Sequence, residues 1–168
     1  AADDAWDRLL EPSLEREMRA ALTDQADEGA IRTFALNLKP LLLQPPVKGK
    51  VTMGLDPGYR NGCKVAVVDP TGKVLDTAVV YPTKPHNKVE EAKKVLRRLC
   101  DAHGVTCVAI GNGTASRESE LFVADFIKEY GRPLSYMVVS EAGASVYSAS
   151  KLGAEEFPDF DVSLRSAV

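Results

Sequence analysis

The chain has 168 residues, of which 45% are hydrophobic and 27% are charged. This length and composition suit one hydrophobic core of roughly 100–150 residues together with a helical appendage. The net charge of −3 argues against a dedicated nucleic-acid clamp, although it leaves room for a local basic patch.

Cysteine usage and hydropathy indicate the compartment. Cys63, Cys100 and Cys107 are odd in number and lack CxxC spacing, so we interpret them as small buried side chains in a reducing environment. There is no signal peptide, and no apolar run approaches the roughly 18 residues of a membrane span. We therefore expect a cytoplasmic protein without a membrane partner. Because the chain starts without Met and stops at Val168, we also expect it to be a piece of a longer protein.

Residues 1–46 are expected to form a helical segment that leads in from the rest of the protein. Apolar residues recur at helical spacing, and Pro12 suits the first turn of a helix. Residues 44–46 (Gln-Pro-Pro) end the pattern, and residues 47–50 are typical of a linker. The helices either pack on other parts of the parent protein or cover one face of a sheet.

Three β-rich runs open a second predicted domain, residues 47–168. The first ends in Asp56 and breaks sharply at Pro57-Gly58, which holds the acid on a rigid element at the edge of the sheet. Turn residues separate this run from the next two, at 62–69 and 74–81. Consecutive strands joined by short turns predict an antiparallel meander.

Helix and strand then alternate, which indicates parallel pairing. A helix is expected over 88–103, a buried strand over 105–110, a helix capped by Ser116, and a strand over 134–139 that leads to Glu141. The strand at 105–110 is apolar without alternation, which predicts an inner strand covered on both faces.

Several long motifs in this order resemble one family. The chain is similar to the YqgF-type domain of the bacterial transcription accessory protein Tex, together with part of the helical segment that precedes it. The resemblance implies an α/β, ribonuclease H-like mixed five-stranded sheet with flanking helices, truncated at its C-terminus. It is carried by residues 34–46, 54–62, 109–118, 139–150 and 157–165.

The resemblance also implies a function. We expect a nucleic-acid-associated scaffold domain of a Tex-like transcription accessory factor, more consistent with a non-enzyme than with a robust nuclease. Nucleic acid, either RNA or DNA, would be bound mainly through other domains of the parent protein, such as an S1 module. The transcription machinery is a further candidate partner.

Asp56 and Glu141 are the candidate catalytic and metal-binding residues. Nucleases of this fold use two divalent ions bridged by three or four carboxylates, so Mg²⁺ or Mn²⁺ would be the cofactor if the domain is catalytic. Asn112 follows the strand where resolvases of the family tend to carry an acid. The alternative function is therefore a metal-dependent, resolvase-type endonuclease that needs a further acid beyond Val168. The structural alternatives are that Asp56 only starts a turn and that Glu141 is only an acid in the first turn of a helix.

Arg60 and Lys64 are the candidate nucleic-acid contacts, although exposed cations are often only solvated. The glycine-rich loop at 111–116 either presents N–H groups to a phosphate or makes a tight turn. A third functional class is an actin-like or sugar-kinase-like ATPase, whose fold also begins with Gly-x-Asp-x-Gly. Against it stand the single sheet unit and the lack of a second phosphate loop in the sequence.

Overall fold

A computed structural model describes residues 2–43 and 47–168. The chain divides into two compact units, residues 1–43 and 44–168. The expected helix stop at residues 44–46 lies outside the described residues, as does the expected boundary between residues 46 and 47.

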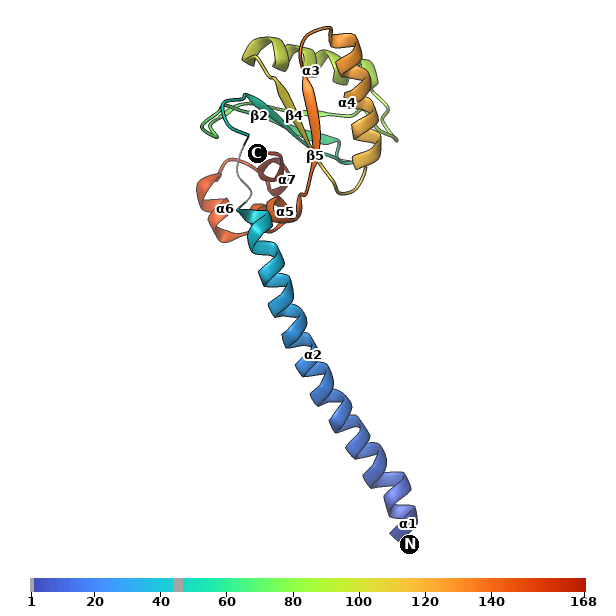
Figure 1. Cartoon of the computed structure of the whole chain (residues 1–168). Helices are drawn as coiled ribbons and strands as arrows, with labels where there is room; N and C mark the ends of the chain where they lie inside the picture. Colours follow the sequence, from blue (N-terminus) through green and yellow to red (C-terminus); the bar gives the residue numbers. More distant parts are fainter. Residues whose placement is uncertain (1, 44–46) are drawn as a thin grey trace. The chain divides into compact units, whose positions relative to one another are not determined.

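The first unit is helical throughout its described residues (Figure 1). A short helix α1 (Ala2–Ala5) and one π-helical stretch η1 (Trp6–Leu10) lead into α2 (Glu11–Leu42). Pro12 lies in the first turn of α2, as its sequence position predicts, because the first turn needs no backbone N–H from that residue. Leu43 follows the last turn of α2 and donates its backbone N–H to Lys39 O.

The second unit contains one sheet of five strands. The strand order is β3-β2-β1-β4-β5. β1 and β2 are antiparallel, as are β2 and β3, whereas β1–β4 and β4–β5 are parallel. The strands are β1 (Thr52–Asp56), β2 (Cys63–Val68), β3 (Val74–Val80), β4 (Cys107–Gly111) and β5 (Ser135–Val139).

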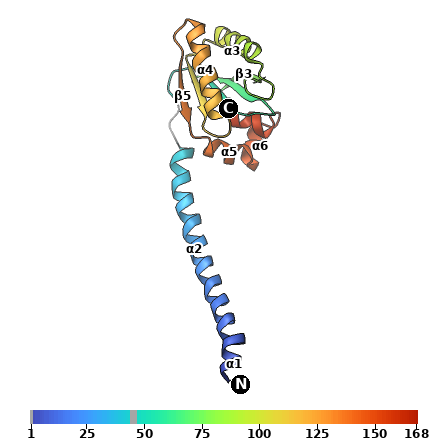
Figure 2. The same cartoon turned by 90° about the vertical axis from the view of Figure 1, so that its right-hand side faces the viewer.

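Five helices accompany this sheet. Two long helices lie side by side (Figure 2), with α3 contacting β3 and α4 contacting β4 and β5. Three short helices gather at the end of the sheet where the parallel strands finish (Figure 1). The helices are α3 (Val89–His103), α4 (Ser116–Tyr130), α5 (Ala142–Ser148), α6 (Lys151–Glu156) and α7 (Val162–Ala167).

The predicted α/β architecture, a mixed five-stranded sheet with flanking helices, is confirmed. The antiparallel meander of β1 to β3 is also confirmed. β4 has a neighbour on each side, in agreement with its continuous apolar run. β2, β3, β4, β5 and α3 begin and end within one or two residues of their predicted bounds, whereas no bounds were predicted for the three short helices after Glu141.

The core lies between one face of the sheet and the two long helices. Alternate residues of β1, Met53 and Leu55, are fully buried there and meet apolar residues of α3 and α4 such as Leu96 and Phe126. The period of two along the strand therefore sends Thr52, Gly54 and Asp56 to the opposite face.

The expectation that Ser116 caps α4 is wrong. Ala115 occupies the cap position with a left-handed backbone (φ 63°), and no side chain caps the helix. The turn after Gly111 is too tight for Ser116 to stand outside the helix, because its N–H already donates to Gly113 O. Gly104 and Gly131 end α3 and α4 in the left-handed conformation that favours glycine.

Candidate functional site

The parallel strands bring the two candidate acids to one edge of the sheet. Asp56 is the last residue of β1, and Glu141 follows β5 by two residues. β4 lies between these two strands and runs parallel to both. The carboxyl ends of β1, β4 and β5 therefore lie at the same edge of the sheet, which brings Asp56 and Glu141 close together although they are far apart in the sequence.

Glu141 is held against the loop that follows β4. Its backbone N–H donates to Asn112 Oδ1 at 3.1 Å, and its carbonyl accepts from Ser145 N–H at 2.8 Å to begin α5. Its carboxylate lies over the glycine loop, because a Cβ added to Gly111 would be 2.5 Å from Glu141 Oε2 and one added to Gly113 would overlap Oε1. The two glycines thus leave the space that the carboxylate fills.

Asp56 is half-buried, and its pKa is raised above the ordinary value of 3.8. Burial is the main cause, and the negative charge of Glu141 is the second. A hydrogen bond from Ser166 and the positive charge of Lys64 act in the opposite direction but do not cancel the increase. The two carboxylates therefore interact electrostatically, which is the behaviour of an acid pair that shares one site.

The last helix covers β1 beside Asp56. α7 contacts β1, β2 and α5, and a Cβ on Gly54 would collide with the backbone carbonyl of Ala167. Asp161 caps α7 by accepting from Leu164 N–H at 2.8 Å. Arg165 ties the helix down with hydrogen bonds to Phe157 O at 3.0 Å and Ser148 O at 3.3 Å.

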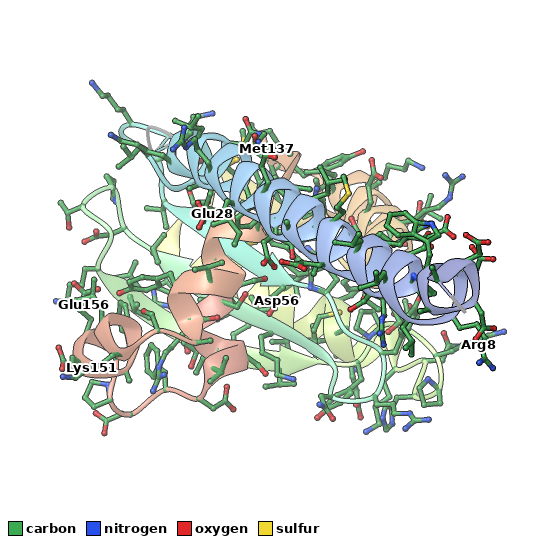
Figure 3. The ribbon with its side chains drawn as sticks, turned by 90° about the horizontal axis from the view of Figure 1, so that it is seen from below. Arg8, Glu28, Asp56, Met137, Lys151 and Glu156 are labelled. Atoms are coloured by element: carbon green, nitrogen blue, oxygen red, sulfur yellow. The ribbon has the colours of Figure 1, made fainter. Side chains whose placement is uncertain are left out.

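A cavity of about 200 Å³ lies under α7, on the sheet face away from the core. In Figure 3 the Asp56 side chain lies beside the C-terminal helices, while Lys151 and Glu156 of α6 lie farther out at the edge of the unit. Small residues form much of the cavity wall, and both acids also line it. Its lining includes Gly54, Asp56, Ala109, Gly111, Glu141 and Ala167.

Arg60 and Lys64 line a second hollow of about 310 Å³ on the other side of Asp56. Lys64 is the partner of Asp56 in the β1–β2 register, yet its ammonium donates to the carbonyls of Asn61 and Gly62. It therefore also stabilises the β1–β2 turn. Arg60 is exposed and forms no ion pair within residues 2–43 and 47–168.

The two carboxylates of this site could bind a divalent cation, but they are few. Carboxylate oxygens suit Mg²⁺ and Mn²⁺, and Asp56 and Glu141 provide two such groups. Among the residues that the structure describes, no cluster of three or more potential ligands is present. These residues fit a single ion with water as its remaining ligands, and they do not supply the carboxylates of a two-ion centre.

Sequence reasoning missed two features of this site. It did not foresee that Ser166 and Ala167 lie beside Asp56 and Gly54, or that Gly111 and Gly113 make room for Glu141. A glycine pair flanking Asn112 was visible in the sequence. It pointed to a turn without indicating which side chain would occupy the space.

The strand order and directions, with Asp56 at the end of β1 and Glu141 after β5, are those of a ribonuclease H-like domain. Residues 50–168 match the family described as the Tex protein YqgF-like domain, and the chain belongs to that family. Across the described residues, no helix has both the length and the apolar character needed to cross a membrane.

The curated relatives that the chain matches are much longer proteins. The chain is 54% identical over 164 residues to the protein named Protein tex of Bordetella pertussis, covering 97% of this chain and 21% of that protein. It is 52% identical over 166 residues to the Transcriptional accessory protein Tex of Neisseria gonorrhoeae, covering 97% and 21%. It is 47% identical over 169 residues to the human S1 RNA-binding domain-containing protein 1, covering 99% and 17%. The chain thus spans about a fifth of these relatives.

Among solved structures, the chain is similar to RuvC of Thermus thermophilus. The TM-score is 0.46 at 18% identity, and the match covers 70% of this chain and 89% of that one. The same protein in complex with a Holliday junction substrate also has a TM-score of 0.46, covering 70% and 87%.

Proposed function

We propose that this chain is a nucleic-acid-associated scaffold domain of a Tex-like transcription accessory factor, without robust nuclease activity. Membership of the Tex YqgF-like family supports the setting, as does the high identity to a protein named for transcriptional accessory function. Nucleic acid, RNA or DNA, is then engaged mainly through other parts of the longer protein. The transcription machinery is a second proposed partner. Three free, buried cysteines suit the reducing cytoplasm as its compartment.

One observation carries this proposal. At the end of β4, between Asp56 and Glu141, the chain supplies the amide of Asn112 flanked by two glycines. The side-chain oxygen Oδ1 of Asn112 already accepts from the Glu141 backbone N–H at 3.1 Å. A carboxylate there would be the natural bridge between two metal ions. The strand ends thus keep the outline of a nuclease centre with two acids, which favours a structural or binding role over cleavage.

A second candidate function is a metal-dependent, resolvase-type endonuclease. The raised pKa of Asp56 favours it, because burial and the Glu141 charge make a second negative charge at the site unfavourable. A divalent cation between the two carboxylates would remove that repulsion. In this alternative, Asp56 and Glu141 are the catalytic and metal-binding residues, and a further acid comes from beyond Val168.

Titration of Mg²⁺ and Mn²⁺ by calorimetry, with parallel cleavage assays, separates the two functions. The assays use single-stranded, duplex and four-way DNA, and RNA, with the wild type and Asp56→Asn. The scaffold proposal expects nucleic-acid binding without cleavage in both proteins. Glu155→Gln on α6 is a control that removes a carboxylate away from the site. Metal-dependent cleavage that is lost in Asp56→Asn and kept in Glu155→Gln would replace the scaffold with the endonuclease.

A further inference from the structure

Tyr59 separates two hollows on the surface of the second unit. The first, about 310 Å³, is lined by Asp56, Arg60 and Lys64. The second, about 470 Å³, is lined by Thr83, Lys84 and Glu118. Tyr59 lines both, so the two hollows adjoin, and we call them together the Tyr59 groove. Each volume falls within the roughly 300–1,000 Å³ of small-ligand sites.

The ring of Tyr59 is fixed and accessible. Its hydroxyl donates to Glu118 Oε1 at 3.0 Å, and this hydrogen bond is the main reason that the pKa of Tyr59 is raised. The side chain is nevertheless 38% exposed. A ring anchored at its polar end and open elsewhere is a preorganised stacking surface.

The walls of the Tyr59 groove are also held in place, although they come from distant parts of the sequence. Thr83, which is buried, donates through Oγ1 to Gly58 O at 3.1 Å. His86 Nε2 lies 3.1 Å from Arg60 O, and its ring packs edge-on against Tyr81. These contacts join the turn after β1 to the loop after β3, so the groove is formed before any ligand arrives.

Cations lie on both sides of the ring. Arg60 and Lys64 line the first hollow, and Lys84 lines the second. Arg60 and Lys84 are exposed, and neither forms an ion pair with any residue in the described ranges. Asp56 and Glu118 are the opposing charges, and Glu118 is engaged by the Tyr59 hydroxyl. An aromatic ring between two unpaired cations can stack a nucleobase, while the cations contact the phosphates on either side of that base.

We propose that the Tyr59 groove binds a short stretch of single-stranded nucleic acid, with one base stacked on Tyr59 and the flanking phosphates at Arg60 and Lys84. This inference rests on the proposed function and specifies the ligand of the domain. An unpaired strand is required because a base in a duplex is already stacked on both faces and cannot reach the ring. A chain with a net charge of −3 also lacks the broad basic surface that duplex binding needs.

The test measures fluorescence anisotropy of the chain with a labelled oligothymidylate of roughly 12 nucleotides and with a duplex of similar length. Tyr59→Leu is expected to weaken single-strand binding about tenfold, while Tyr59→Phe, which keeps the ring, retains it. The double variant Arg60→Gln/Lys84→Gln is expected to weaken binding and to reduce its dependence on salt. Lys94→Gln, an exposed cation of α3 outside the groove, is the matched control.

The outcomes separate this inference from the proposed function. Single-strand binding that is unaffected by Tyr59→Leu and by Arg60→Gln/Lys84→Gln would overturn the groove and leave the scaffold function standing. A preference for duplex would overturn the groove in the same way. Failure of the wild-type chain to bind a single strand would also overturn the groove alone, because the proposed function places most nucleic-acid binding in other parts of the longer protein. Circular dichroism of each variant excludes unfolding as the cause of a loss.

Discussion

The carboxylate of Glu141 occupies the space that a side chain on Gly113 would need. These two positions are 28 apart in the sequence, and the parallel pairing of β4 with β5 brings them together. The colliding group is the far end of a flexible side chain, so a larger residue at 113 would displace Glu141 without breaking the sheet.

Gly113→Ala should therefore change the electrostatics of the site more than the stability of the fold. We expect a cost below about 1 kcal/mol and a fall in the pKa of Asp56 toward its ordinary value. Burial, the larger cause, would keep part of the increase. Carbon-13 NMR titration of the Asp56 carboxyl measures the change. Gly29→Ala, where an added Cβ meets nothing within 4 Å, is the control; an identical titration in both variants would contradict the prediction.

Gly54→Ala should instead reduce the stability of the fold. The added Cβ would meet the backbone of Ala167, including its carbonyl carbon at 3.2 Å, so α7 itself must move. We expect a loss of about 1–3 kcal/mol in urea denaturation. Alanine is normally preferred over glycine inside a strand by roughly 0.5–1 kcal/mol, so a gain in stability would show that α7 does not rest on β1 in solution.

Asp56→Asn should make the chain relatively more stable as the pH rises. A raised carboxyl pKa means that the folded state holds the proton more tightly than the unfolded state, so ionised Asp56 destabilises the fold. The penalty is absent below pH 3.8 and develops as the pH rises through the pKa of the folded state. We expect a difference below about 1 kcal/mol at pH 7, because solvent screens a half-exposed carboxylate.

Thermal melts from pH 3 to 7 measure this difference, and Asp69→Asn supplies a control of opposite sign. The pKa of Asp69 is lowered by hydrogen bonds from the hydroxyl and N–H of Thr71. The folded state therefore favours ionised Asp69, and this variant should lose stability as the pH rises. A large loss of melting temperature in Asp56→Asn would instead identify Asp56 as a structural turn residue.

The thiol of Cys100 should resist modification in the folded chain. It is 2% exposed, and burial, followed by the charge of Asp101, raises its pKa to about 11. The thiolate is the reacting form, so reaction with a disulfide reagent at pH 8 should be at least roughly a hundredfold slower than in urea. Mass spectrometry after timed quenching checks this; rapid labelling of native Cys100 would contradict its burial.

The local patterns were enough to predict the sheet and the two acids. Three of these patterns involve only residues close together in the sequence, so they can be read without the structure. They are the alternation in β1, the continuous apolar run of β4 and the turn residues at Pro57-Gly58. Acids that follow parallel strands must meet at one edge, so Asp56 and Glu141 could be placed by topology alone.

The contacts made by α7 could not be predicted in this way. Gly54 and Ala167 are more than a hundred residues apart, and no periodicity connects a strand glycine to a helix carbonyl. The left-handed Ala115 is a similar case, since its conformation follows from the space left between β4 and α4 and not from its own preference. Tertiary packing determined both.

The length of α2 has a consequence for the timescales on which the chain opens. All side chains described along α2 are exposed except that of Leu38, which is half-buried. Helical hydrogen bonds without burial open by local fraying, whereas those of β1 open only when the buried sheet does. In hydrogen–deuterium exchange, amides of α2 should therefore exchange early and those around Met53 and Leu55 last. The chain would then have two distinct ranges of amide exchange rates. A partner that binds α2 would be detected as slower exchange of the α2 amides.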